Sequence, residues 1–339
     1  MQRKKFISST LLGLTALTVS AKGFTNNEDE DSTIKIPIYL KKGDTIGISS
    51  VAGFISIDEC KEAIDTIHNW GFNTQIGLAL GKKFFVFGGT DDERIADFQE
   101  LLDNENINAI MCARGGYGLV RIIDRLNFTK FIKKPKWIIG FSDVTVLHSH
   151  INKNFSIATI HSKMCNSFVP TATAEPIQLD TLDSIRQCLI GQKMIYNTTP
   201  NSNNKIGNAK GILVGGNLKT LESLSASKSD INTKNKILFV EDTGEKLYSI
   251  DRMFWNLKRS GKLTNLAALI VGGFKIKKDE EGDEFGKTIE EIVLEKITEY
   301  NYPVCFDFAV GHQKNNFALK CGIMHKLIIS ENDCKLIEN

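Results

Sequence analysis

The sequence predicts an α/β protein, with an N-terminal parallel-sheet, Rossmann-like domain followed by a smaller mixed α/β C-terminal domain. Three observations lead to this prediction. In residues 34–165, short apolar runs of strand length alternate with segments whose apolar positions recur at helical spacing. Residues 166–205 break that alternation with three prolines and a run rich in Asn, Ser and Thr. At 339 residues, the chain is long enough for two domains.

Each element of the N-terminal domain, residues 34–165, follows from a local pattern. One helix is expected to begin at Thr90, because Glu93 lies three residues later in the position of a capping box. Since strands alternate with helices, the strands should be parallel and covered by helices. The expected strands are residues 45–49, 108–113 and 137–140, and the expected helices are residues 58–70, 90–102, 119–126 and 143–151.

The C-terminal domain is expected over residues 206–339, after an inter-domain linker at residues 166–205 that holds one helix near residues 179–189. Short strands separated by helices indicate a second, mixed α/β domain. The expected strands are residues 211–214, 236–240, 267–271, 304–309 and 326–330, and the expected helices are residues 220–224, 250–260 and 287–299.

Residues 1–21 have the features of a secretory signal peptide rather than of a folded element. Basic residues at positions 3–5 precede a mostly apolar run without acidic residues, and Val19-Ser20-Ala21 fits a small-residue cleavage site. Residues 22–33 are expected to be a flexible lead into the first domain. This pattern predicts an exported, periplasmic protein. A retained N-terminal anchor and a cytoplasmic location are the alternatives.

Two further observations bear on the compartment. The apolar run at residues 6–20 is too short to span a bilayer comfortably, which argues against a retained anchor. The seven cysteines are an odd number without close pairs in the sequence, whereas an oxidising compartment favours paired cysteines. Cys112 and Cys305 lie in apolar runs and are expected to be buried small hydrophobes.

The composition is that of an ordinary globular protein, with 42% hydrophobic and 24% charged residues. The formal net charge of +2 provides no basic excess, so the sequence argues against a nucleic-acid partner. We also expect no stable membrane insertion once the signal peptide is removed.

Ser142 lies where an apolar strand ends and a helix is expected to begin. The strand ends in Gly140, and the helical pattern starts directly after Ser142. A serine in this position presents its hydroxyl at the C-terminal edge of a parallel sheet, near the positive end of a helix, where hydrolases place a nucleophile. The match to the G-x-S-x-G pattern is partial, because Val144 stands at the last glycine. From this motif alone, Ser142 is either a nucleophile or a helix N-cap.

An acid and a histidine also follow apolar strands. Glu241 directly follows one strand, and His312 follows a Gly soon after another. Strand ends on one side of a sheet are where α/β proteins gather their sites, so these residues can form a Ser–acid–His triad with Ser142. Asp242 and Glu245 compete with Glu241 for the position of the acid.

The glycine-rich segment at residues 114–118 follows a strand and precedes an expected helix, so its N–H groups could bind an anion. A nucleotide phosphate is the generic interpretation, but the segment lacks the Lys-Ser/Thr of a P-loop. In a hydrolase, the same N–H groups would stabilise an oxyanion.

A metal site has weaker support, although His148, His150, His161 and Cys165 lie close in sequence. His148 and His150 are two residues apart on an expected helix and point about 200° apart, so they cannot easily share one ion. The sequence contains no H-E-x-x-H pattern.

Taken in chain order, these segments resemble the serine LD-carboxypeptidases, or muramoyltetrapeptide carboxypeptidases, a family that includes the microcin C immunity peptidases. The resemblance spans nearly the whole chain after the signal peptide. It is carried by residues 42–53, 87–94, 113–118, 140–143, 215–218, 240–242, 248–252 and 311–312. The resemblance implies that Ser142 is the nucleophile, His312 the base, and Glu241 the residue that orients the base.

The same resemblance implies that the backbone N–H groups of Gly116 and Asp143 stabilise the oxyanion, and that no metal or cofactor is needed. It implies substrate contacts for four side chains, those of Arg114, Tyr117, Asn217 and Arg252.

The activity implied by the resemblance is removal of the terminal D-alanine from murein tetrapeptides through an acyl-enzyme, with a muropeptide or peptidoglycan stem peptide as substrate. One alternative is a microcin-immunity-type peptidase that cleaves an aminoacyl-nucleotide conjugate. A Trp on an active-site loop would favour it, and the sequence shows no clear candidate. The other alternative is a non-catalytic muropeptide-binding protein with an inert triad. The sequence leaves open whether the protein forms a homodimer.

Overall fold

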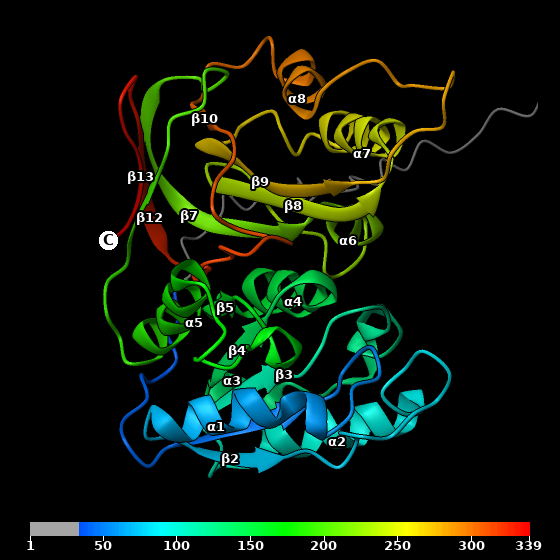
Figure 1. Ribbon diagram of the computed structural model, residues 1–339, viewed down its shortest axis with the longest axis vertical. Coiled ribbons are helices and arrows are strands. Elements are labelled where there is room, and N and C mark those ends of the chain that lie inside the picture. The colour runs from blue at the N-terminus through cyan, green and yellow to red at the C-terminus, as the bar shows by residue number, and fades with distance from the viewer. Residues whose placement is uncertain (1–33) are drawn as a thin grey trace, which may run out of the picture. The chain divides into compact units, whose positions relative to one another are not determined.

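The computed structural model describes residues 34–339, so the expected signal peptide (1–21) and flexible lead (22–33) lie outside the described residues. Residues 34–339 form two sheets, one of six strands and one of seven, with helices packed against them (Figure 1). The α/β class with a parallel first sheet and a mixed second sheet is therefore confirmed.

The first sheet has the strand order β11-β5-β4-β3-β1-β2, and all its neighbouring pairs are parallel except β11 with β5. Its strands are β1 (Thr45–Ser49), β2 (Asn73–Ile76), β3 (Ala109–Cys112), β4 (Trp137–Gly140), β5 (Thr159–His161) and β11 (Leu319–Cys321). The order 2-1-3-4-5 reverses between β1 and β3. In such sheets ligands bind beyond the carboxyl ends of the strands, near the reversal.

The helices that accompany this sheet are α1 (Lys61–Asn69), α2 (Asp91–Asp103), α3 (Thr129–Lys133) and α4 (Thr145–Phe155). The predicted capping box of α2 is confirmed, because Thr90 accepts from the Glu93 N–H and Glu93 accepts from the Thr90 N–H. Central strands β3 and β4 are buried at every position, as expected for strands covered on both faces.

The helix predicted over residues 119–126 is wrong. This segment forms two short 3-10 turns, at Leu119–Arg121 and Ile123–Arg125. Side chains from other elements hold the backbone where the helix would begin. Arg94 donates to the Gly118 carbonyl, and Asp143 accepts from the Leu119 N–H.

The second sheet has the order β10-β9-β8-β7-β12-β13-β6. Strands β7 to β10 pair in parallel, whereas β12, β13 and β6 continue the sheet in antiparallel fashion. The strands are β6 (Ile195–Thr198), β7 (Gly207–Asn217), β8 (Ile237–Glu245), β9 (Ala268–Ile276), β10 (Val304–Cys305), β12 (Met324–Ile329) and β13 (Cys334–Glu338). The strand predicted over residues 304–309 is shorter than expected, because Asp307 has a φ of 55° that an extended strand cannot contain.

The helices of the second half are α5 (Pro176–Leu189), α6 (Leu218–Ser223), α7 (Leu247–Arg259) and α8 (Ile289–Lys296). The segment expected as a linker, residues 166–205, contributes α5 and the sheet strand β6. Conversely, β11 belongs to the first sheet, although in chain order it comes after most strands of the second sheet.

The two sheets share an apolar core. The largest cluster of buried hydrophobic residues includes Ile139 and Ile160 from the first sheet together with Leu213 and Phe239 from the second. Helix α4, which starts directly after the Ser142 turn, lies between the sheets (Figure 1). The carboxyl end of β4 is therefore held against the second sheet by packing on both sides.

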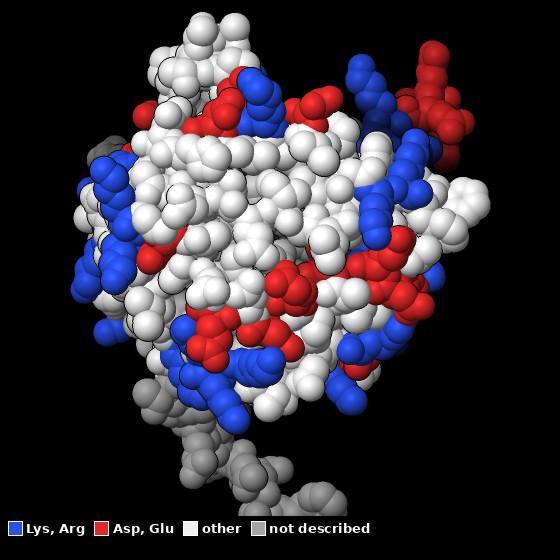
Figure 2. Space-filling model, turned by 90° about the horizontal axis from the view of Figure 1, so that it is seen from below, with Lys and Arg blue, Asp and Glu red and all other residues white. Residues whose placement is uncertain are grey.

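The face seen in Figure 2 carries Lys and Arg interspersed with Asp and Glu, and no continuous basic surface covers it. Within residues 34–339, no helix has the length and apolar character needed to cross a bilayer.

Candidate functional site

Ser142 occupies a strained turn between β4 and α4. Phe141 is extended, Ser142 has a φ of 61°, and a 3-10 turn over Ser142–Val144 leads into α4. A left-handed φ at a non-glycine residue costs about 1–2 kcal/mol. A Cβ at Gly140 would lie 2.8 Å from a methyl carbon of Val144, so this position requires glycine. The half-buried Ser142 side chain is held at the sheet edge by this geometry.

The glycine-rich loop after β3 lies directly against Ser142. A Cβ built on Gly115 would meet the Ser142 Cβ at 3.0 Å and its Oγ at 3.2 Å. The Gly115 carbonyl accepts from the Gly53 N–H at 2.9 Å, and the Asp143 carboxylate accepts from the Leu119 N–H at 2.8 Å. The loop is therefore fixed at both ends beside the Ser142 turn.

The N–H groups of Gly116 and Asp143 make no hydrogen bond to the protein within residues 34–339, so both are available to a ligand. The Asp143 side chain, in contrast, is occupied by the loop. Burial raises the pKa of this carboxyl to about 6, and the Arg94 guanidinium and the hydrogen bond from Leu119 oppose that shift.

Glu241 and His312 form a hydrogen-bonded pair on the second sheet. The His312 Nδ1 lies 2.6 Å from the Glu241 Oε2, and the Glu241 side chain is fully buried. The register of β8 against β9 shifts between Val240 and Asp242, which leaves Glu241 on a bulge. Bulges often re-aim a side chain next to a site. Gly311 is required here, because a Cβ would lie 2.5 Å from that of Glu241.

The His312 ring lies against the Ser142 turn. Its centroid is 4.7 Å from that of Phe141, the residue before Ser142. In the part of the chain that the structure describes, the Ser142 hydroxyl makes no hydrogen bond. Such bonds are often long before substrate binds. The structure thus brings Ser142, His312 and Glu241 to one place at the meeting of the two sheets.

The other candidate acids point elsewhere. The Asp242 carboxylate accepts from the Lys219 N–H at 2.8 Å and from the Asn217 amide at 3.1 Å, and burial raises its pKa to about 6. Glu245 accepts from the Ser249 hydroxyl at 2.6 Å. Neither side chain contacts His312.

The four predicted substrate contacts have different surroundings. Asn217 is buried, and its amide oxygen caps α6 by accepting from Thr220. Arg252 is exposed on α7 and lies over the Tyr248 ring. Arg114 donates to a loop carbonyl and is partly exposed, and Tyr117 is exposed on the glycine-rich loop.

Two further histidines, His148 and His161, are buried. His148 donates to the Gly140 carbonyl at 2.8 Å, and burial lowers its pKa to about 4. His161 is fully buried at the end of β5, where burial lowers its pKa well below the usual range. Within residues 34–339, no group of three or more His, Cys, Asp or Glu residues is placed to hold a metal ion. All seven cysteines are buried, as predicted for Cys112 and Cys305.

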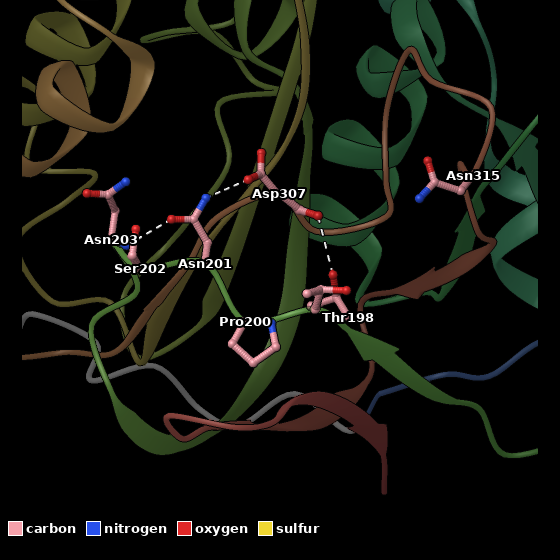
Figure 3. A pocket seen from close by; sticks show the side chains of 8 residues that line it. Thr198, Pro200, Asn201, Ser202, Asn203, Asp307 and Asn315 are labelled. Atoms are coloured by element: carbon pink, nitrogen blue, oxygen red, sulfur yellow. Dashed lines mark hydrogen bonds between the residues drawn. The ribbon is translucent and has the colours of Figure 1, made fainter.

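A polar hollow of about 470 Å³ lies elsewhere, beside the loop after β6 (Figure 3). In it, the Asn201 amide donates to the Asp307 carboxylate, and the Thr198 hydroxyl donates to the Asp307 carbonyl. Ser142, Glu241 and His312 do not line this hollow, so it is not the site assembled above.

One residue beside the site was missed from the sequence. Lys163 follows β5 by two positions, and its ammonium donates to the Gln313 carbonyl at 2.6 Å. The signal that could have found it is the one used for Ser142, a polar residue just beyond a buried strand.

Family models match both halves of the chain. The model for the LD-carboxypeptidase N-terminal domain matches residues 46–162, and the model for the LD-carboxypeptidase C-terminal domain matches residues 210–327. The chain belongs to the LD-carboxypeptidase family. Ser142 lies in the first matched domain, and Glu241 and His312 lie in the second. As a family member, the chain is a carboxypeptidase.

Relatives in the family carry two kinds of name. A probable murein peptide carboxypeptidase of Bacillus subtilis is 32% identical, over 84% of this chain and 89% of the relative. The murein tetrapeptide carboxypeptidase of Pseudomonas aeruginosa is 25% identical, over 82% of this chain and 91% of the relative. The microcin C7 self-immunity protein MccF of Escherichia coli is 28% identical, over 84% of this chain and 90% of the relative.

Solved structures of both kinds share the fold. The muramoyltetrapeptide carboxypeptidase of Oxalobacter formigenes superposes with a TM-score of 0.78 at 24% identity, covering 87% of this chain and 99% of that one. MccF in complex with glutamyl sulfamoyl guanosine gives a TM-score of 0.78 at 24% identity, covering 89% and 98%.

Proposed function

We propose that this LD-carboxypeptidase cleaves its substrate with Ser142 as nucleophile, His312 as general base and Glu241 as the residue that orients the base. The observation that carries the proposal is the 2.6 Å contact between His312 Nδ1 and the buried Glu241 carboxylate, on a ring packed against the Ser142 turn. Because the carboxylate holds the Nδ1 proton, Nε2 is left as the acceptor.

In this mechanism His312 takes the Ser142 proton as the hydroxyl attacks the peptide carbonyl. The N–H groups of Gly116 and Asp143 stabilise the oxyanion, each contributing roughly 3 kcal/mol to the transition state. His312 then protonates the departing amino group, and water attacks the acyl-enzyme with His312 again as base. Glu241 stays ionised and balances the charge of the imidazolium.

We propose the terminal D-alanine of a murein tetrapeptide as the residue removed. The names of the relatives from Bacillus subtilis and Pseudomonas aeruginosa support this substrate. Arg114 and Tyr117 are exposed on the loop that contacts Ser142, and we propose that their side chains contact the peptide.

A second candidate is cleavage of an aminoacyl-nucleotide conjugate. It is favoured by the 28% identity to MccF, a relative that has been solved with glutamyl sulfamoyl guanosine. Comparing kcat/KM for a muramyl tetrapeptide and for an aminoacyl sulfamoyl nucleoside distinguishes the two substrates.

The decisive experiment incubates the purified protein with a muramyl tetrapeptide and follows free D-alanine by mass spectrometry. Labelling by a fluorophosphonate that requires Ser142 would exclude the non-catalytic binding protein. Absence of both D-alanine release and labelling would contradict the proposal.

We further propose that the protein is exported, with residues 1–21 as its signal peptide. The support is the basic start, the apolar run and the Val19-Ser20-Ala21 site in the sequence. Sequencing the N-terminus of the protein from its native host tests this proposal, since a mature chain should begin near Lys22.

A further inference from the structure

Lys163 places a positive charge beside the two segments that carry Ser142 and His312. Its ammonium donates to the carbonyl of Gln313, the residue after His312, at 2.6 Å. The same nitrogen lies 5.9 Å from the ring centroid of Phe141, the residue before Ser142. Lys163 therefore touches the chain neighbours of both reacting side chains.

This charge is incompletely compensated by the protein. An ammonium group has three N–H donors, and the Gln313 carbonyl occupies one of them. Within residues 34–339, no carboxylate oxygen lies within ion-pair distance of Lys163. Burial, and to a smaller extent the charge of Lys275, lower the pKa of Lys163 to about 8, while Glu241 opposes the shift. The Lys163 amine is still mostly protonated at pH 7. An anionic ligand would compensate its positive charge.

We infer that Lys163 binds the terminal carboxylate of the peptide whose last residue is removed. The inference rests on the function proposed above. A carboxypeptidase must recognise a free carboxylate one residue beyond the scissile carbonyl, about 4 Å away along the chain. The Lys163 ammonium lies beside the chain neighbours of Ser142 and His312, on the side of the site where that carboxylate would bind. Arg252 is exposed on α7, and the Asn217 amide caps a helix, so neither fits this role as well.

Two peptides test the inference, a muramyl tetrapeptide with a free terminal carboxylate and the same peptide with a terminal carboxamide. The wild-type protein should prefer the free acid by about 10- to 100-fold in kcat/KM, as expected for a charge-assisted hydrogen bond. Lys163→Met should lose most of that preference through a higher KM for the acid, with the amide little affected. Lys163→Arg should restore part of it.

Lys136→Met is the matched control. Lys136 is also a buried lysine whose pKa burial lowers to about 8, and its ammonium also donates to backbone carbonyls. It precedes β4, at the opposite end of that strand from Ser142. Removing it should leave the acid-to-amide preference unchanged, which separates loss of a buried lysine from loss of this one.

Two results would overturn the inference in distinguishable ways. If Lys163→Met turns over both peptides with the wild-type preference, the carboxylate is bound elsewhere, with Arg114 the next cation to replace. If wild-type protein cleaves neither peptide, the proposed function fails and the inference fails with it. Binding of the tetrapeptide to Ser142→Ala protein, weakened about 10-fold or more by Lys163→Met, gives a readout independent of turnover.

A second, independent observation concerns Cys305 and Cys334. Their sulfur atoms lie 3.0 Å apart, and both side chains are fully buried. That separation is only about 1 Å longer than the roughly 2.05 Å of a disulfide bond. Cys305 ends β10, seven residues before His312, and Cys334 begins β13.

The geometry points to a Cys305–Cys334 disulfide when the protein folds under oxidising conditions. The two thiols lose two protons and two electrons to a disulfide oxidant, which is reduced to two thiols as the new S–S bond forms. The bond would tie the start of the His312 loop to the C-terminal strand.

Refolding the protein with oxidised glutathione tests this assignment. Thiol titration in denaturant should find two thiols fewer than the seven of the reduced chain, and peptide mapping should recover the Cys305–Cys334 pair. The Tm should rise by roughly 5 °C, and Cys305→Ser should show no such rise. Seven free thiols after this treatment, or a bond between other cysteines, would overturn the assignment.

Discussion

Replacing Glu241 with Gln tests the hydrogen bond on which the proposed mechanism depends. The Glu241 Oε2 lies 2.6 Å from His312 Nδ1, and the other oxygen, Oε1, is buried without a hydrogen bond to residues 34–339. Gln has nearly the same shape but no charge. The imidazolium formed when Ser142 gives up its proton would then lose the negative charge beside it.

The expected loss of activity follows from two effects. A hydrogen bond to a charged group contributes about 1.5–3 kcal/mol, which corresponds to roughly 10- to 150-fold in rate. An amide that donates to Nδ1 would also place the ring proton on Nε2, where His312 could no longer accept from Ser142. In a trypsin-type triad the corresponding substitution costs about 10⁴ in kcat. We expect kcat to fall by about 10²- to 10⁴-fold, with KM changed little.

The assay is release of the terminal residue from a muramyl tetrapeptide, with circular dichroism and Tm to verify the fold. Glu245→Gln is the control, because Glu245 lies on the same strand and bonds Ser249 instead of His312. It should change kcat by less than about threefold. The reasoning is refuted if Glu241→Gln keeps more than about a third of wild-type kcat, or if Glu245→Gln is the more damaging change.

Three further predictions follow. Ser142→Ala and Ser142→Gly should both lower kcat by about 10⁴- to 10⁶-fold. The Gly variant should be the more stable of the two by about 1 kcal/mol in urea unfolding, because the backbone at position 142 has a φ of 61°. Gly311→Ala should reduce kcat at least tenfold, because the new Cβ would lie 2.5 Å from that of Glu241 and displace the acid–base pair; wild-type kinetics would contradict this. Burial raises the pKa of Asp143 from 3.8 to about 6, so between these values the folded protein keeps a proton that the unfolded chain loses. The free energy of unfolding should therefore fall by about 2 kcal/mol as pH rises from 4 to 6, and urea titrations should show this contribution disappear in Asp143→Asn.

The parts of the site that could be predicted from the sequence are those encoded locally. Ser142, Glu241 and His312 each follow a recognisable apolar run, and α/β proteins gather functional residues at strand ends. The capping box of α2 is a three-residue pattern and was equally readable. What the fold adds is the packing of the two sheets that brings Ser142 to Glu241 and His312.

Features that depend on pairing between distant segments could not be predicted in this way. The bulge that aims Glu241 exists only because β8 and β9 shift register, and β11 joins the first sheet across more than a hundred residues of chain. The turns at residues 119–125 replace a helix because Arg94 and Asp143 take its first backbone groups. Local periodicity carries no information about such partners.

Asn217 shows how the two halves of the site are held in register. Its backbone N–H donates to the Thr145 hydroxyl at 3.0 Å, which joins β7 to the first residue of α4 just after the Ser142 turn. Its amide donates to Asp242, the residue next to Glu241. Gly216 has no side chain here because a Cβ would lie 2.4 Å from that hydroxyl. One buried residue thus connects the strand that carries Glu241 to the helix that follows Ser142. Since the polar groups that it satisfies are buried on both sides, any sliding between the sheets would leave them unpaired.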